Sequence, residues 1–275
     1  MRSGKERSSS FRVQRAVIDG VDAVEADTAQ AFGRHMHDQF GIGLIERGAQ
    51  ISLSGRGVVE AATGDIITVN PGEVHDGAPI GEGGRSWKML YFEPALLART
   101  VHDMTEGRRD GCELAHPVIR DAALADRYRA LLAAMTAPSG AASAMRAEET
   151  LFLMLAPLVE EGRAVDRRRS FPKAIALARA RIDDDPAASL TLDDLARLCA
   201  ISRFQVVRGF ARATGLTPHA YMIQRRLQMA RRLIARDVGL AEAAASSGFA
   251  DQSHMTRLFV RAYGLSPGCY AAARR

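Results

Sequence analysis

A pattern of short helix, tight turn and longer helix occurs twice in the last hundred residues of this 275-residue chain, and it constrains the fold more than any other feature. The first copy runs from the segment 190–202 into a helix expected at 203–214. The second runs from the segment 240–249 into a helix expected at 252–263. This arrangement is the helix-turn-helix unit, whose second helix enters the major groove of DNA. Two copies in one segment predict an all-helical domain that binds double-stranded DNA.

The sequence between the two copies predicts one long helix. Thr217 is suited to be its N-cap and Pro218 its first residue, and the helix should continue to about Ala235. A helix of about 19 residues is about 28 Å long, a little less than the roughly 34 Å between successive major grooves on one face of DNA. We therefore expect one chain to place both second helices in adjacent grooves, with some bending of the DNA.

Charge is distributed unevenly between the two parts of the chain. Residues 1–165 contain 18 Lys and Arg against 23 Asp and Glu, a net −5, whereas residues 166–275 contain 19 against 9, a net +10. A strongly basic segment is typical of a protein that binds a polyanion. No apolar run in the sequence is long enough to span a bilayer, so we expect no membrane partner. Three scattered cysteines fit neither a disulfide framework nor a zinc-finger spacing, which favours the cytoplasm.

Each of the two longer helices has a face expected to be buried and a face expected to contact DNA. Val206 and Phe210 are four residues apart, as are Met255 and Phe259, so each pair should lie in the core. Base edges can be recognised by Arg at guanine, Gln at adenine, and Phe or Val at the thymine methyl. The residues expected to contact bases are Arg203, Phe204, Val207 and Arg208 in the first helix and Gln252, Ser253, Thr256 and Arg257 in the second.

For some of these basic residues another role is equally compatible with the sequence. Arg208 and Arg257 could instead contact phosphates or form salt bridges within the domain. On the long helix we expect solvent-facing or phosphate-facing arginines rather than base contacts; these are Arg225, Arg226, Arg231 and Arg232. Cys199 is expected to be a small core residue.

The first part of the chain alternates short strands with glycine turns. Strands expected from 11 to about 92, at spacings near ten residues, predict a small barrel or sandwich. From about 117 the apolar spacing becomes helical, which predicts a pair of helices. The fold class is therefore α+β with two domains. The expected divisions are a disordered lead-in at 1–14, a β-barrel at 15–116, a helical hairpin at 117–161, a linker at 162–170 and a DNA-binding domain at 171–275.

Two groups of side chains in the β-rich part are expected to line a pocket for a small molecule. His35 and His37 are two residues apart on a strand and therefore face the same side, and His75 follows a Pro-Gly turn that should return to the barrel mouth. On another strand Trp87, Met89 and Tyr91 also share a face. A barrel of this size can hold one small ligand, although the same side chains could simply fill its interior.

The motifs resemble those of a known family. The segments 201–221 and 248–267, the second containing Gly-Phe-Ala-Asp-Gln-Ser-His, resemble the DNA-binding unit of the AraC/XylS family of bacterial transcription regulators. The segments 35–37, 43–48 and 64–75 resemble the cupin-type effector domain that precedes this unit in the sugar-responsive branch. The resemblance implies sequence-specific DNA binding, a small-molecule effector, usually activation of transcription with RNA polymerase as partner, and a homodimer formed through the helical hairpin. The hairpin could instead pack only against its own barrel.

Three convergent imidazoles could also hold a divalent metal ion. However, the metal-binding cupins carry a Glu that three or four intervening residues separate from the second histidine, and at those positions this chain has Gly41 and Ile42. We therefore expect no metal or other cofactor, and we expect His35, His37 and His75 to form hydrogen bonds in a polar pocket or pack at its rim.

The sequence thus predicts a transcription regulator controlled by a small cytoplasmic effector, and not an enzyme. The sequence shows no nucleophile–base constellation and no phosphate-binding loop. Two alternatives remain: a metal-dependent cupin enzyme with a basic helical appendage, and a DNA binder that responds to no effector.

Overall fold

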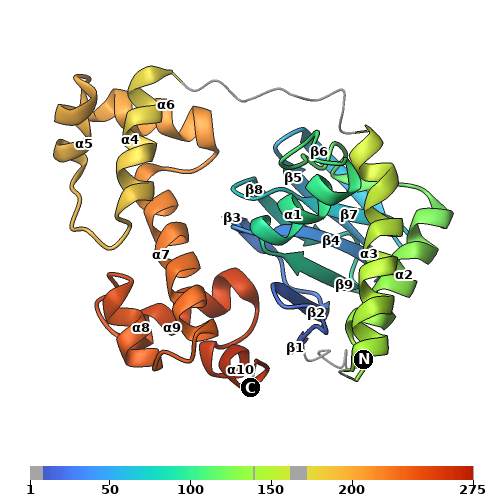
Figure 1. The fold of residues 1–275 in the computed structure, drawn as a ribbon. Helices are drawn as coiled ribbons and strands as arrows, with labels where there is room; N and C mark the ends of the chain where they lie inside the picture. The colour runs from blue at the N-terminus through green and yellow to red at the C-terminus, as the bar shows by residue number, and fades with distance from the viewer. Residues whose placement is uncertain (1–8, 139, 162–171, 275) are drawn as a thin grey trace, which may run out of the picture. The chain divides into compact units, whose positions relative to one another are not determined.

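The computed structural model describes residues 9–138, 140–161 and 172–274, and it divides into two compact units, residues 1–166 and 167–275 (Figure 1). The first unit is β-rich with a helical pair and the second is all-helical, which confirms the expected α+β fold with two domains. The expected linker at 162–170 and residues 1–8 of the expected lead-in lie outside the described residues.

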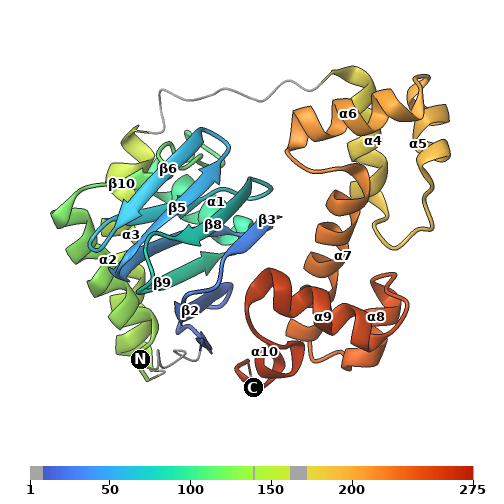
Figure 2. The same cartoon turned by 180° about the vertical axis from the view of Figure 1, so that it is seen from behind.

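Two antiparallel sheets make up the β-rich part of the first unit. The strands of the six-stranded sheet, in spatial order, are β1 (Ser10–Arg15), β2 (Val21–Thr28), β9 (Arg85–Phe92), β4 (Phe40–Arg47), β7 (Ile66–Val69) and β10 (Val118–Ile119). Those of the four-stranded sheet are β3 (Phe32–Met36), β8 (Val74–Pro79), β5 (Ala49–Ser54) and β6 (Gly57–Ala62). Figure 2 shows β5, β6 and β8 side by side. The two sheets form the expected cupin-like barrel.

Strand β9 separates two environments, because its side chains alternate between the two faces of the sheet. Leu90 and Phe92 are fully buried in the main core, which they share with three helices. These helices are α1 (Pro94–Met104), α2 (Ala122–Met135) and α3 (Ala141–Glu161), and α2 and α3 lie side by side in Figure 1. Trp87 and Tyr91 lie on the opposite face, where their rings approach residues of and beside β3. This inner face carries the side chains expected from the sequence to line a pocket.

The structure differs from the sequence-based boundaries at both ends of the barrel. Residues 10–14, expected to be disordered, belong to β1, which pairs with β2 along its whole length. Phe11 explains the difference, because its ring packs edge-on against Phe32 and Trp87, at 5.9 and 6.3 Å between centroids. At the other end, Val118 and Ile119 form β10 rather than the start of the helical hairpin.

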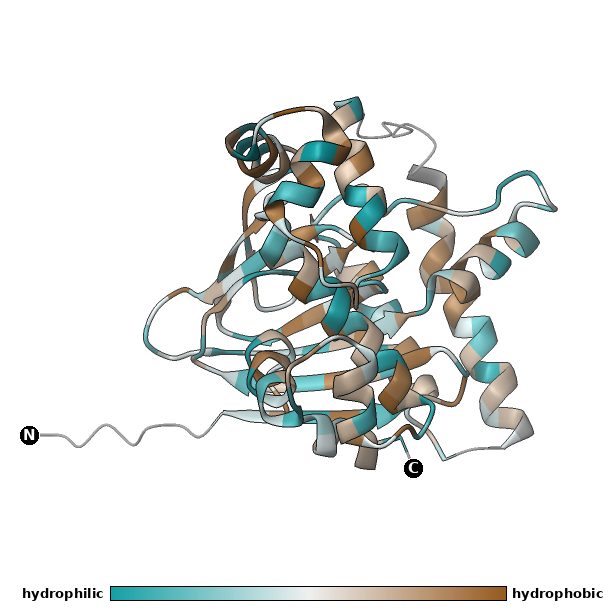
Figure 3. Cartoon of the chain, turned by 90° about the vertical axis from the view of Figure 1, so that its left-hand side faces the viewer, coloured by the Kyte–Doolittle hydropathy of each residue, from teal (hydrophilic) through white to brown (hydrophobic). Residues whose placement is uncertain are grey.

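The second unit consists of seven helices among its described residues. They are α4 (Lys173–Asp184), α5 (Leu192–Cys199), α6 (Arg203–Thr214), α7 (Pro218–Ala235), α8 (Leu240–Ser246), α9 (Gln252–Tyr263) and α10 (Pro267–Ala272). The bounds expected for α6 and α9 are confirmed. Hydrophobic and hydrophilic segments alternate along the helices in Figure 3, as amphipathic helices require. Among the described residues no helix combines the length and apolar composition of a membrane span.

Local capping explains why α6, α7 and α9 begin where they do. The Ser202 hydroxyl accepts a hydrogen bond from the backbone N–H of Gln205, while the Gln205 side chain accepts one from the Ser202 N–H. The Thr217 hydroxyl accepts one bond from the Ala220 N–H at the start of α7, as expected, and the Asp251 carboxylate accepts one from the His254 N–H at the start of α9. Each bond satisfies an otherwise unpaired N–H of the first turn and is worth about 1 kcal/mol.

Candidate nucleic-acid interface and effector site

The second helices of the two helix-turn-helix units, α6 and α9, have the expected buried faces. Val206 and Phe210 in α6, and Met255 and Phe259 in α9, have no exposed surface. Each pair occupies the fourth and eighth positions of its helix, so the two helices are built alike. The opposite faces are open, and the Phe204 side chain is 70% exposed there. An aromatic ring left in water at this position is available to a partner surface.

The polar residues expected to contact DNA lie on these open faces but differ in their partners. Arg203 pairs with Asp193 of α5 at 3.4 Å. Arg208 and Arg257 are exposed, each at the sixth position of its helix. Among the residues that the structure describes, neither arginine side chain has a hydrogen-bond or ion-pair partner. The expected residues that remain are either exposed or half-buried; these are Val207, Gln252, Ser253 and Thr256. The fold therefore leaves two equivalent guanidinium groups open to an anionic partner.

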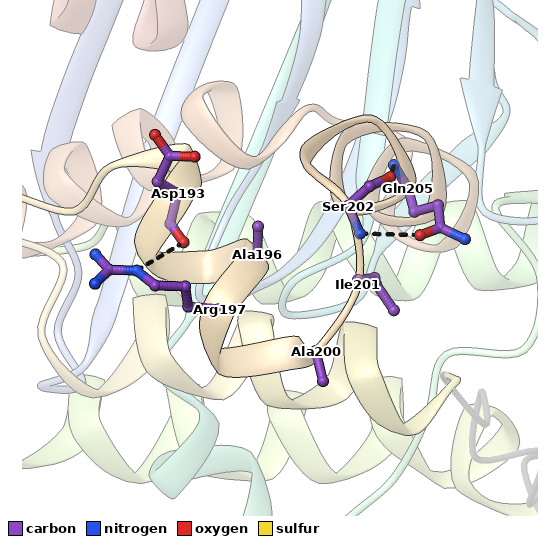
Figure 4. Close-up of a pocket in the computed structure, with 7 residues that line it drawn as sticks. All are labelled: Asp193, Ala196, Arg197, Ala200, Ile201, Ser202 and Gln205. Carbon is purple, nitrogen blue, oxygen red and sulfur yellow. Dashed lines mark hydrogen bonds between the residues drawn. The ribbon is translucent and has the colours of Figure 1, made fainter.

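A surface hollow of about 740 Å³ lies at the turn between α5 and α6 (Figure 4). Its polar side chains are already engaged: Arg197 bonds to Asp193 and Asp194, and Gln205 bonds to the Ser202 cap. The apolar lining is limited to small and branched residues at its base, Ala196, Ala200 and Ile201. We attribute this hollow to the helix-turn-helix geometry itself rather than to a ligand site.

The expectation for three of the four arginines of α7 is wrong, because they hold the domain together. Arg226 donates to the backbone carbonyls of Pro186, Ala188 and Gly248 at 2.8, 3.0 and 2.7 Å. The buried Arg231 bonds to the Tyr270 hydroxyl at 3.3 Å, and Arg225 pairs with Asp183 at 2.8 Å. Only Arg232 is exposed as expected. Loops packed against a helix leave carbonyl oxygens that need donors, and a long arginine side chain can reach them. Cys199 is buried, as expected.

In the first unit the three expected histidines come together between the sheets. Strands β3 and β8 pair so that His35 and His75 are direct partners. Their ring centroids lie 4.4 Å apart, and that of His37 lies 5.0 Å from His35 and 5.1 Å from His75. His35 and His37 are buried and His75 is half-buried. Tyr91 completes the group, with its ring 5.0 Å from that of His37.

Hydrogen bonds define how two of these imidazoles are protonated. The Nδ1 atom of His35 lies 2.7 Å from the carbonyl oxygen of Gly33, and that of His75 lies 3.0 Å from the carbonyl oxygen of Glu73. A carbonyl can only accept, so each Nδ1 carries the hydrogen and each Nε2 is left with a lone pair. Burial lowers the pKa of His35 to about 3 and also lowers the pKa of His75. Both rings are therefore neutral at neutral pH.

Met89 occupies the space over strand β4. Gly41 and Gly43 pair directly with Tyr91 and Met89 across the sheet. A Cβ added at Gly41 would lie 2.8 Å from the Met89 Cε, and one at Gly43 would overlap the Met89 Sδ. The place where metal-binding cupins carry their glutamate is thus filled by Met89 and Tyr91. Ile42 lies on the other face, in the main core.

Arg85 belongs to the same inner face and was missed in the sequence. Its guanidinium is only 1% exposed and donates to Gln50 Oε1, the Gln30 carbonyl and the Gly77 carbonyl at 3.0 to 3.1 Å. It also lies 4.7 Å from the ring centroid of Trp87. Burial lowers the pKa of Arg85 to about 10. The period of two that placed Trp87, Met89 and Tyr91 on one face would have identified Arg85, two residues earlier.

Two protein families match the chain. The family described as the AraC-like ligand binding domain matches residues 20–155, and the family described as a helix-turn-helix domain matches residues 195–273. The chain is 28% identical over 229 residues to the uncharacterised HTH-type transcriptional regulator YbfI of Bacillus subtilis, covering 82% of each chain. It is 25% identical over 257 residues to the HTH-type transcriptional activator RhaS of Escherichia coli, covering 89% of this chain and 90% of RhaS.

Solved structures of ToxT from Vibrio cholerae share the fold. An apo form of a ToxT variant aligns over 100% of both chains with a TM-score of 0.57 at 10% identity. Wild-type ToxT with bound unsaturated fatty acid aligns over 98% of this chain and 97% of ToxT, with a TM-score of 0.57 at 12% identity. The β-rich ligand-binding domain and the doubled helix-turn-helix domain together identify the chain as a member of the AraC family of DNA-binding transcription regulators.

Proposed function

We propose that this regulator is a cytoplasmic homodimer that activates transcription when a small effector occupies the space between its two sheets. The observation that carries the proposal is the pair of equivalent open faces on α6 and α9, each with an exposed arginine at its sixth position. Membership of a family of transcription regulators makes the chain a regulator and not an enzyme, so the alternative of a metal-dependent cupin enzyme is wrong.

The DNA-reading role is assigned to the eight exposed or half-buried residues of α6 and α9 named above. Arg208 and Arg257 are the strongest members, because an unpaired guanidinium can bind the O6 and N7 atoms of guanine through two hydrogen bonds. Loss of one such contact costs about 1–3 kcal/mol, or roughly 5-fold to 150-fold in affinity. If the arginine contacts a phosphate instead, its loss weakens binding to every DNA sequence about equally.

The test is binding to the intergenic DNA upstream of the gene, compared with scrambled DNA at one fixed salt concentration. We expect tight binding to the upstream DNA only, and we expect Arg257→Ala to weaken it. Arg261→Ala is the matched control, because Arg261 is exposed one helical turn later on α9. Equal binding of wild type to both DNAs, at a salt concentration where nonspecific binding is weak, would contradict sequence-specific recognition.

The effector role is assigned to the inner face formed by His35, His37, His75, Trp87 and Tyr91, with Met89 beneath them. The aromatic rings offer stacking surfaces, and the Nε2 atoms of His35 and His75 offer hydrogen-bond acceptors, for a small polar ligand such as a sugar, an amino acid or an aromatic acid. A bound unsaturated fatty acid in ToxT, which shares the fold, supports a carboxylate as a further class.

Trp87 is the single tryptophan of the chain, so its fluorescence reports directly on this site. We expect one of these ligand classes to change the emission and to shift the DNA-binding constant. A ligand changes the population of the DNA-binding state only by its difference in affinity between the two states. If a ligand binds until the change in emission is complete but the DNA-binding constant stays the same, the chain is a DNA binder that responds to no effector.

We infer activation from the similarity to RhaS, which is named a transcriptional activator. An activator of this kind is expected to contact RNA polymerase. Transcription in vitro from the upstream promoter should rise when the protein and its effector are both added. A fall in transcription would make the protein a repressor.

A further inference from the structure

The cluster of His35, His37 and His75 has the composition of a metal site. Each histidine offers one ligand nitrogen, and these three atoms all lie within 4.8 Å of one another. Nitrogen–metal bonds of about 2.0–2.1 Å require ligand nitrogens no more than about 4.2 Å apart. The observed spacing exceeds this limit by less than 1 Å, a gap that rotation of the imidazoles can reduce.

The anchoring of the rings supports the same conclusion. His35 and His75 each place Nδ1 on the carbonyl oxygen of the residue two positions earlier, so each presents Nε2 as the free nitrogen. Histidines that bind metals are typically held in this way, with the second ring nitrogen donating to a backbone carbonyl or a carboxylate. The two anchors are backbone atoms: the Gly33 carbonyl lies in β3, and the Glu73 carbonyl lies in the turn before β8. The backbone therefore sets the orientation of both rings.

The ligand type selects the class of ion. Three imidazoles, with no carboxylate or thiolate in the group, suit zinc, nickel, cobalt or copper and do not suit magnesium or calcium, which prefer oxygen. We propose that His35, His37 and His75 bind one divalent transition-metal ion through their imidazole nitrogens, with a coordination position left open beside Tyr91.

This reverses the expectation of no metal, which rested on the missing glutamate. Met89 and Tyr91 fill the glutamate's place, so no fourth protein ligand is supplied from Gly41. Three protein ligands with one open position form a complete set for zinc, in which water or a small ligand takes the fourth place. The ion would thus give the effector domain a Lewis-acidic point at which a carboxylate or hydroxyl of a ligand can bind.

The experiment uses the full-length protein without a histidine tag, stripped with a chelator and then titrated with Zn²⁺ or Co²⁺. Binding is measured by competition with a chromophoric chelator and by elemental analysis after dialysis. We expect one ion per chain, a raised melting temperature, and a Co²⁺ absorption spectrum typical of nitrogen ligands.

His75→Asn is the informative variant, because the Asn amide can replace the Nδ1 bond to the Glu73 carbonyl while the ligand nitrogen is removed. We expect it to melt near the metal-free wild type and to bind Zn²⁺ at least about 100-fold more weakly, a larger loss than removal of an outer partner causes. His102→Gln is the matched control, because His102 is exposed outside the cluster and bonds to Asp110.

Two results would overturn the proposal. Substoichiometric zinc in the wild type would do so, and so would equal loss of zinc in His75→Asn and His102→Gln, which indicates an adventitious ion on surface histidines. The metal site does not rest on DNA binding. DNA binding is measured separately on the stripped protein. A negative result for metal binding therefore does not affect the test of DNA binding, and a negative result for DNA binding does not affect the test of the metal site.

Discussion

Arg226 of α7 donates a hydrogen bond to the carbonyl oxygen of Gly248 at 2.7 Å, and the same guanidinium bonds to the loop that precedes α5. Gly248 lies in the turn between α8 and α9, with φ at +77°. A Cβ there would lie 2.8 Å from the Ala187 carbonyl oxygen, so the two loops are in close contact. One side chain thus bonds to the loops of both helix-turn-helix units.

Arg226→Lys should uncouple the two units, because an ammonium group cannot reach both loops at once. We expect destabilisation of about 1–3 kcal/mol, from buried carbonyls left without donors, and a larger loss of affinity for a two-half-site operator than for a single half-site. Urea unfolding and binding titrations on both DNAs measure this. Arg236→Lys, an exposed change at the C-cap of the same helix, is the control. Equal losses on both DNAs would show that the bond does not set the spacing.

Phe204→Ala should remove a contact with a thymine methyl group and leave the fold intact. The side chain is 70% exposed, so its loss should change stability by less than about 0.5 kcal/mol. For wild type we expect replacement of one operator thymine by deoxyuridine, which lacks the methyl, to weaken binding. For Phe204→Ala that difference should vanish. If the thymine-to-deoxyuridine replacement weakens binding of the variant as much as it weakens binding of wild type, Phe204 does not contact that methyl group.

The face of α3 that carries Met145 and Leu153 should mediate dimerisation. These side chains are 64% and 61% exposed, and Phe152 beside them is 39% exposed. Their separation of seven and eight residues places them on one side of the helix. Leu153→Asp should raise the dimer dissociation constant at least 10-fold in sedimentation experiments. Val58→Asp, at a 66% exposed residue of β6, should leave it unchanged. A dimer unaffected by Leu153→Asp would mean that the hairpin packs only within its own chain.

Tyr221 should make the stability of the DNA-binding domain decrease in alkali. Burial, and then the carboxylate of Asp183, raise its pKa to about 12; its hydroxyl donates to Asp183 at 2.8 Å. The pKa of Tyr221 in the folded protein is above the unfolded value of about 10. The stabilisation that the neutral, hydrogen-bonded phenol gives the folded domain is therefore complete below pH 10 and is lost as the pH rises towards 12. The stability difference between wild type and Tyr221→Phe, from urea unfolding, should shrink across this window by an amount of the order of 2 kcal/mol. A constant difference from pH 9 to 12 would contradict the assignment.

Local features of the sequence were sufficient for the bounds and inner faces of α6 and α9. Ser202 and Asp251 cap their helices through bonds that span three residues, and the core pairs lie one turn apart. Such interactions depend only on neighbours in the chain, so spacing reveals them. The shared face of Trp87 and Tyr91 was predictable for the same reason.

Only the tertiary structure decided which distant residues meet. His35 and His75 become partners through the register of β3 and β8. Arg85 is placed by its pairing with Thr28 of β2, and the glutamate-replacing Met89 by its pairing with Gly43 of β4. The arginines of α7 look alike in sequence, yet Arg226 and Arg231 turn inward and Arg232 does not. Long side chains bond to whatever carbonyls the packing leaves without donors. That requirement arises between loops far apart in the chain, so the sequence by itself determined the helices α6, α7 and α9, and packing decided the edge strands β1 and β10 and the site.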